Sequence, residues 1–214
     1  MKFVDLTQTI SPNMQVYPGT EPPVFQLACT IEKDGFKEVK MQFYSHTGTH
    51  MDSPAHIFTN GKSLDKFPID SFYGKGVLVD CTNVEEGKEI TEDYIAQIED
   101  NLNEAEFILF YTGWDKKWGD NRYFEGFPTI STQLADRLCK LNIKGIGIDA
   151  ISVEPVTSIN LEIHQKILGQ EILIIENLTG LEALIGKEFS ISAFPLKTTE
   201  ADGSPIRAVA FIEE

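Results

Sequence analysis

The sequence has few cysteines and histidines and no long hydrophobic segment. Its three cysteines, Cys29, Cys81 and Cys139, lie far apart and form no C-x-x-C pair. This spacing argues against a disulfide framework and against a zinc site built from thiolates, and it suits a reducing compartment. No apolar run reaches the roughly 18 residues of a membrane span, and residues 1–12 lack the apolar core and cleavage site of a signal peptide. The sequence therefore predicts a cytoplasmic protein.

Positive charge is also scarce. The chain has 18 Lys and Arg residues against 33 Asp and Glu residues, which gives a formal net charge of −15. A charge of this sign opposes binding to nucleic-acid backbones and to anionic lipid surfaces. The acidic residues are dispersed along the chain, so charge alone indicates no particular ligand. We therefore expect neither a nucleic-acid nor a membrane partner, and the charge says little about the substrate.

The pattern of apolar residues predicts a mixture of strands and helices. Apolar or β-branched runs of strand length predict buried strands at Gly76–Cys81, Glu106–Thr112, Ile143–Ala150 and Glu171–Asn177. Helical patterns follow Thr91 and Ser131, either of which can cap a helix, and a third extends over Asn160–Gly169. The first third of the chain looks strand-like, and the tail resembles two strands joined by the turn Glu200–Pro205. A single mixed α/β domain over residues 1–214 is expected.

Three of the four histidines lie within eleven residues. They are His46, His50 and His56, in the segment "SHTGTHMDSPAHIF", and Asp52 lies among them. The β-branched residues, Gly48 and Pro54 make a continuous helix unfavourable here. In an extended chain, alternate residues project to one side, and these four residues all have even numbers. The segment therefore predicts a cluster of polar side chains on one side of an extended chain.

Imidazole nitrogens and a carboxylate oxygen suit a divalent ion such as zinc or manganese. A site with three such ligands leaves positions open for water, whose pKa a bound ion lowers toward neutrality. The other interpretation is that these histidines are turn or surface residues. His164 and Glu176, taken alone, can be a core histidine and the end of a strand at the surface. If both converge on the cluster, they add ligands for a second ion bridged by a carboxylate.

The segment "HTGTHMDSPAH" resembles the H-x-G-T-H-x-D-x-P-x-H motif of the cyclase-like metal-dependent hydrolases. Bacterial kynurenine formamidase and isatin hydrolase belong to that family. Weaker similarity extends over most of the chain, including "DLTQTISPNMQVYPGTEPP", "YTGWDKKWG", "GIGIDAISVEP" and "HQKILGQEILIIENLTGLE". The resemblance implies a swivelling β/β/α fold and a homodimer or homotetramer. It also implies two zinc ions, although some relatives hold one ion, often manganese.

The resemblance also implies roles for individual residues. By position in the motif, His46, His50 and Asp52 would hold one ion. Asp52 and Glu176 would bridge to a second ion, which His164 would also hold. His56, the last residue of the motif, would be the general acid/base and not a ligand.

The function expected from these roles is metal-dependent hydrolysis of a small amide by activated water, with N-formylkynurenine the first candidate among arylformamides. Opening of a cyclic amide or ester, as in isatin hydrolysis, is the alternative. A non-catalytic metal-binding interaction protein is a second alternative, and His56 argues against it. Tyr17 lies where formamidases commonly have a substrate-stacking tryptophan. Asp149, after a predicted strand, can orient a ligand histidine or close a turn.

Overall fold

The computed structural model describes residues 1–213. The strands are β1 (Lys2–Asp5), β2 (Val24–Cys29), β3 (Glu38–Gln42), β4 (His50–Asp52), β5 (Tyr73–Asp80), β6 (Glu89–Ile90), β7 (Phe107–Tyr111), β8 (Thr129–Ile130), β9 (Gly145–Ile148), β10 (Leu173–Glu176), β11 (Phe189–Ser192), β12 (Gly203–Pro205) and β13 (Val209–Ile212). The α-helices are α1 (Ile31–Asp34), α2 (Thr132–Leu138) and α3 (Glu162–Leu168). The 3₁₀ helices are η1 (Pro54–His56), η2 (Leu64–Lys66), η3 (Ile69–Phe72), η4 (Glu92–Asn101), η5 (Trp114–Lys117), η6 (Asn121–Phe124) and η7 (Leu181–Leu184).

One nine-stranded sheet organises the molecule, in the order β1-β13-β11-β5-β7-β9-β10-β4-β12. Its central strands β5, β7, β9 and β10 are parallel, and they coincide with the four strands predicted from apolar runs. The strands on either side of this centre pair antiparallel. Ligands of open parallel sheets bind beyond the carboxyl ends of the strands. Glu176, the last residue of β10, lies at such an end.

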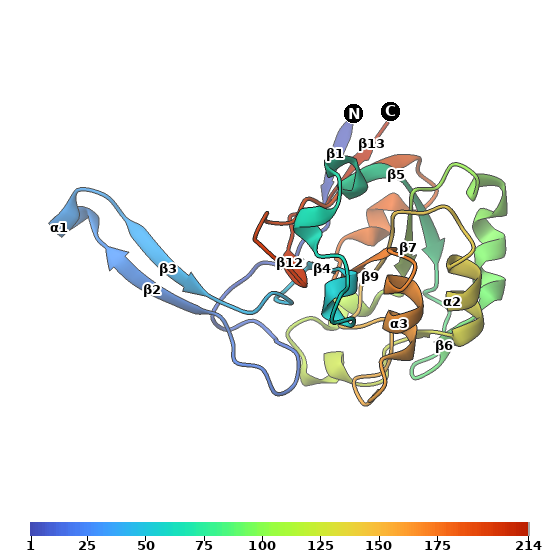
Figure 1. The fold of residues 1–214 in the computed structure, drawn as a ribbon, viewed down its shortest axis with the longest axis horizontal. Coiled ribbons are helices and arrows are strands. Elements are labelled where there is room, and N and C mark those ends of the chain that lie inside the picture. Colours follow the sequence, from blue (N-terminus) through green and yellow to red (C-terminus); the bar gives the residue numbers. More distant parts are fainter. Residues whose placement is uncertain (214) are drawn as a thin grey trace.

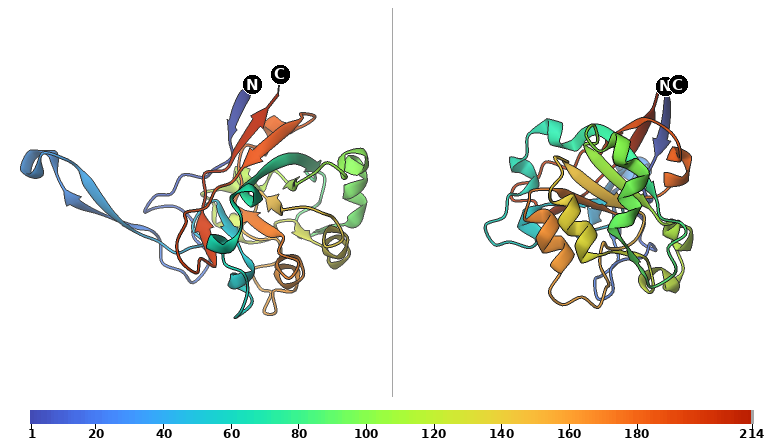
Figure 2. Two further views of the ribbon diagram at one scale, coloured as in Figure 1. Left: turned by 45° about the horizontal axis from the view of Figure 1, so that its top comes forward. Right: turned by 90° about the vertical axis from the view of Figure 1, so that its right-hand side faces the viewer.

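The central strands are buried on both faces, which explains their unbroken apolar sequences. In β7, Ile108 and Phe110 belong to a core that also contains residues of α2, α3 and η4, whereas Phe107 and Leu109 belong to a second core. Figures 1 and 2 show α2 and α3 lying together on one side of the sheet. The mixed α/β fold expected from the sequence is therefore confirmed. No helix among residues 1–213 is long and apolar enough to cross a membrane.

Helices are present at all three predicted places, with different local chemistry. Ser131 caps α2, and its hydroxyl oxygen accepts a hydrogen bond from the backbone N–H of Leu134 at 3.2 Å. Thr91 precedes η4, which is a 3₁₀ helix, and its side chain makes no capping hydrogen bond. In α3 the buried side chains include His164, as its place on the apolar stripe predicts.

Ser131 makes a capping hydrogen bond and Thr91 does not, and this difference gives a prediction for the stability of the protein. The Ser131→Ala variant should unfold with a free energy about 1 kcal/mol lower, because one N–H at the start of α2 loses its acceptor. The matched Thr91→Ala variant should change the free energy of unfolding much less, since no capping bond is lost. Urea denaturation of the two variants measures both values. Equal losses in the two variants would contradict this account of the caps.

The structure departs from the expected elements at two places. The strand-like first third contains a short helix, α1, at the tip of a hairpin formed by β2 and β3, and this hairpin arm projects far from the body (Figure 1). The predicted tail turn Glu200–Pro205 is wrong as a simple turn, because it contains β12. Gly203 and Pro205 of β12 pair with β4 at the edge of the large sheet. Proline is tolerated on an edge strand, where its missing N–H breaks no ladder.

Candidate metal centre

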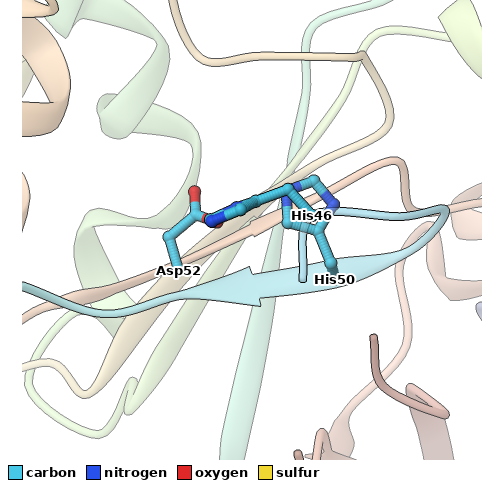
Figure 3. A group of neighbouring side chains, drawn as sticks. All are labelled: His46, His50 and Asp52. Carbon is cyan, nitrogen blue, oxygen red and sulfur yellow. The ribbon is translucent and has the colours of Figure 1, made fainter. Parts of the chain in front are cut away.

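The histidine-rich segment folds as a turn, a short strand and a 3₁₀ helix. His46 lies in the turn, and the backbone bends at Gly48, whose φ of +66° favours glycine. His50 and Asp52 lie on β4 and project to the same side (Figure 3), while Met51 between them is buried in the second core. Pro54 begins η1, which carries His56. The predicted alternation of side chains along an extended chain therefore holds only for His50 and Asp52 on β4. His46 and His56 reach the same region through bends of the chain.

The two distant residues converge on this segment. Strand β10 pairs antiparallel with β4, and this register places Glu176 opposite His50. Helix α3 brings the Nε2 atom of His164 to 3.4 Å from Oε1 of Glu176 and 3.9 Å from Oδ2 of Asp52. Nε2 of His50 lies 3.3 Å from Oδ1 of Asp52 and 3.4 Å from Oε2 of Glu176. Residues more than a hundred positions apart in sequence thus surround one small volume.

Two groups of potential ligands share Asp52. His46, His50 and Asp52 form one, and Asp52, His164 and Glu176 form the other; within each group the ligand atoms lie within 4.8 Å of one another. Oδ2 of Asp52 is buried and has no hydrogen-bond partner within residues 1–213. An orphaned buried carboxylate oxygen is costly unless it meets a cation. The nitrogen and oxygen donors, without thiolates, fit a divalent ion such as zinc or manganese.

The histidines and carboxylates of the cluster shift one another's pKa values. Burial acts to lower the pKa of His50, but the carboxylates of Asp52 and Glu176 outweigh burial and raise it to about 10. For His46 the same opposition, with Asp52 and Asp202 as the anions, raises the pKa to about 9. Burial acts to raise the pKa of Asp52, yet the charges of His46 and His50 hold it well below its usual range. The carboxylates thus attract positive charge into the centre, which protons or metal ions can supply.

His56 differs from the other three imidazoles. Its side chain is 29% exposed, and it borders a cavity of about 400 Å³ that His46, His50 and His164 also line. Burial is the main cause that lowers the pKa of His56 below its ordinary value. A neutral imidazole at the edge of a cavity can accept a proton from a molecule bound there. This placement suits the acid/base role that the resemblance implies.

Tyr17 lies on the wall of the same cavity. The residue is 38% exposed, and its hydroxyl donates a hydrogen bond to the carbonyl of Val156 at 3.2 Å. The bond fixes the ring beside the segment that leads into α3. No Lys or Arg is among the described residues that line the cavity. The position of Tyr17 therefore permits contact with a bound aromatic molecule.

Sequence reasoning missed two carboxylates of the centre. Asp202 precedes β12 and lies with its Oδ2 atom 3.1 Å from Nε2 of His46. Glu154 is buried, and its Oε1 atom lies 2.6 Å from Nδ1 of His164. Asp149 does not orient a histidine; it accepts hydrogen bonds from the backbone N–H groups of Thr112 and Gly113 and so ties the segment after β7 to the end of β9. No local pattern distinguishes Asp202 or Glu154 from the many other acidic residues of the chain.

Comparisons with known proteins agree with this geometry. The family model described as putative cyclase matches residues 4–155. A kynurenine formamidase of Bacillus cereus is 30% identical over 210 residues, covering 97% of this chain and 96% of the relative. An uncharacterized protein of Methanocaldococcus jannaschii is 36% identical over 215 residues, covering 99% of this chain and all of the relative.

Solved structures share the fold. Isatin hydrolase A of Ralstonia solanacearum superposes with a TM-score of 0.88 at 24% identity, covering 99% of this chain and 92% of that one. A predicted metal-dependent hydrolase of Bacillus stearothermophilus gives a TM-score of 0.80 at 27% identity, covering 98% of this chain and 97% of that one. The chain belongs to the putative cyclase family, and it is a hydrolase with a centre suited to a divalent metal ion.

Proposed function

We propose that this member of the putative cyclase family hydrolyses a small arylformamide, with N-formylkynurenine the first substrate to test. The proposal is supported by full-length similarity to kynurenine formamidases together with the two ligand groups that share Asp52. In it, His46, His50, Asp52, His164 and Glu176 would hold one or two ions, zinc in the first place and manganese as the alternative. When bound, such an ion lowers the pKa of a coordinated water and stabilises negative charge on a carbonyl oxygen.

The remaining steps belong to side chains of the cavity. His56 accepts the proton released when water attacks the carbonyl carbon, and it returns a proton to the leaving nitrogen. Its position at the cavity edge, beside the proposed ligands, supports this role. The ring of Tyr17 packs against the aromatic part of the substrate. Its hydrogen bond to Val156 limits rotation of the ring and so supports a fixed contact surface.

A second candidate function is the opening of a cyclic amide such as isatin. The described residues of the cavity lining include no Lys or Arg, so a substrate carboxylate would meet only the imidazoles and the ion of the metal centre, and a substrate without a free carboxylate, such as isatin, needs neither contact. Turnover of N-formylkynurenine and of isatin, each with zinc-loaded and manganese-loaded protein, separates the two candidates. Failure on both would reject the proposed substrates and leave the metal centre to be judged by metal analysis.

We also propose that the protein is a homodimer, which can pair further into a homotetramer. The support is the hairpin arm, whose strands β2 and β3 are exposed along almost their whole length. Its exposed apolar side chains are Val24, Phe25, Leu27, Ile31, Phe36, Val39 and Met41. An isolated two-stranded hairpin is marginally stable in water, and exposed apolar patches of this kind mark interfaces.

The charge of the arm fits a second copy of this chain. Residues 24–42 contain three Lys and three acidic residues, so the arm is neutral although the chain carries a net charge of −15. A neutral apolar arm can lie on another acidic copy without the repulsion that an acidic arm would meet. Because Tyr44 and Ser45, just after the arm, line the cavity, dimer contacts here would lie close to the proposed active site.

The dimer predicts a mass of about twice the 24.0 kDa of one chain in sedimentation equilibrium. Replacing Leu27 and Met41 together by Asp should shift the protein toward monomer, because both side chains are more than half exposed on the arm. The matched control is Ile69→Asp, a still more exposed apolar side chain on the body of the molecule, which should leave the mass unchanged. A monomeric wild-type protein would contradict the proposal.

A further inference from the structure

The ring of His46 lies between two carboxylates. Its Nδ1 atom is 2.7 Å from Oδ1 of Asp52, and its Nε2 atom is 3.1 Å from Oδ2 of Asp202. Asp52 belongs to the buried centre, whereas the side chain of Asp202 is 46% exposed and lies on the cavity side. A neutral imidazole carries one N–H and one lone pair, so an acceptor at one nitrogen leaves the lone pair on the other. The two nitrogens of this ring therefore face carboxylates of different exposure, and in the neutral ring only one of the two nitrogens carries the proton.

The other two imidazoles of the centre are oriented the opposite way round. His50 directs Nε2 toward the buried carboxylates, and its Nδ1 donates to the carbonyl of Gly48 at 2.8 Å. His164 also directs Nε2 inward, while its Nδ1 lies 2.6 Å from Oε1 of Glu154. Each outer acceptor thus fixes an N–H on the nitrogen that faces away from the centre. Such outer partners orient metal-binding histidines and raise their basicity.

We propose that Asp202 is a positioning residue of the metal centre, which accepts the Nε2–H of His46 and so makes Nδ1 the ligating nitrogen of that residue. His50 and His164 ligate through Nε2, with Gly48 and Glu154 as their outer acceptors. The inference rests on the metal centre of the proposed function and not on the identity of its substrate. It assigns a role to a residue that the histidine motif does not contain.

The backbone around Asp202 is built to hold this contact. The carbonyl of Asp202 accepts hydrogen bonds from the N–H and the hydroxyl of Ser53, at 2.9 and 3.0 Å, which ties it to the end of β4. Oδ2 of Asp202 also accepts from the hydroxyl of Ser45 at 3.3 Å. The ring of His46 rests on Gly203, where an added Cβ would lie 2.5 Å from Cε1 of His46. Asp202 and Gly203 together thus form a cradle for one imidazole.

The rival arrangement is a cation held by His46, His56 and Asp202, whose ligand atoms also lie within 4.8 Å of one another. In that arrangement Nε2 of His46 would be the ligating nitrogen. The buried group is favoured because Asp52 is only 1% exposed and has an orphaned oxygen, whereas Asp202 is partly solvated and already has hydrogen-bond partners. The two arrangements predict opposite nitrogens on the same ring, so one measurement separates them.

The test is a long-range ¹H–¹⁵N correlation spectrum of the zinc-loaded full chain, labelled with ¹⁵N in its four histidines. The expected spectrum has His46 with zinc on Nδ1 and a proton on Nε2, and His50 and His164 with zinc on Nε2. Zinc on Nε2 of His46 would overturn the proposal. A result as expected combined with no hydrolysis of any amide would reject the proposed function and leave this inference standing.

The Asp202→Asn variant tests the role of the carboxylate. Its amide can donate as well as accept, so it no longer selects one form of the His46 ring. Zinc affinity, measured by competition with a chelating dye, should fall about 10–100-fold, and the His46 signals should no longer show the single wild-type form. The control is Asp70→Asn, an exposed carboxylate on η3, which should bind zinc as the wild type does. Unchanged affinity and an unchanged His46 signal in Asp202→Asn would overturn the proposal.

Discussion

Replacing His56 by Ala is expected to lower kcat/KM for amide hydrolysis about 10²–10⁴-fold while the bound metal stays unchanged. The reason is positional. His56 lies on η1 at the edge of the cavity, and it belongs to neither of the two ligand groups that share Asp52. Its imidazole is therefore free to move a proton between water and the leaving nitrogen. Steady-state kinetics and metal analysis on the same preparation measure both quantities.

The result for His56→Ala separates a proton carrier from a ligand. Loss of metal in parallel with loss of activity would make His56 a ligand, as in the group that it forms with His46 and Asp202. Unchanged kinetics with full metal content would remove His56 from the mechanism. Added imidazole gives a control, because a small base that enters the cavity should restore part of the activity only if a proton acceptor is what the variant lacks.

The Asp52→Ala variant is expected to lose its bound metal and about 10³-fold or more in activity, since activation of water depends on the metal. Asp52 is the only residue common to the two buried ligand groups within residues 1–213. Removing it leaves His46, His50 and Glu176 without the carboxylate that joins the two groups. The effect should exceed that of Asp202→Asn, which weakens a metal contact through one imidazole and removes no proposed ligand.

Two measurements check the Asp52 prediction. Metal content after extensive dialysis should fall to background, and turnover should not recover when zinc or manganese is added. The Asp70→Ala control, on an exposed part of η3, should retain metal and activity, which excludes a general effect of lost negative charge. Circular dichroism shows whether the variant still folds. A folded Asp52→Ala protein with full metal content would contradict the shared-ligand arrangement.

The sequence predicts the centre of the sheet and the core of the site for the same physical reason. Both depend on dense local patterns. Buried parallel strands need continuous apolar runs, as in Phe107–Tyr111, and the motif concentrates four polar groups within eleven residues. His164 and Glu176 each stand in an apolar surrounding where a polar side chain is costly, but their roles as ligands are implied by the family resemblance. These patterns are visible in the amino-acid sequence itself, so the elements that depend on them can be predicted without coordinates.

The residues that sequence reasoning missed lack any such local pattern. Asp202 and Gly203 lie in a segment rich in turn-forming residues, and β12 is three residues long with a proline, so nothing marks it as a strand. Its role follows from pairing with β4, a contact between distant parts of the chain. The sequence predicts strands in the exposed arm, but its projection from the body depends on which surfaces it does not pack against, and no residue pattern shows this.

The most direct test of the account is removal and return of the metal. Protein purified without added ions should contain at least about half an ion per chain or take up zinc or manganese when these are supplied. Dialysis against a chelator should abolish hydrolysis of N-formylkynurenine or isatin, and adding the ion back should restore it. A chain that holds no metal under either condition, or that hydrolyses the amide equally well without metal, would contradict the central claim.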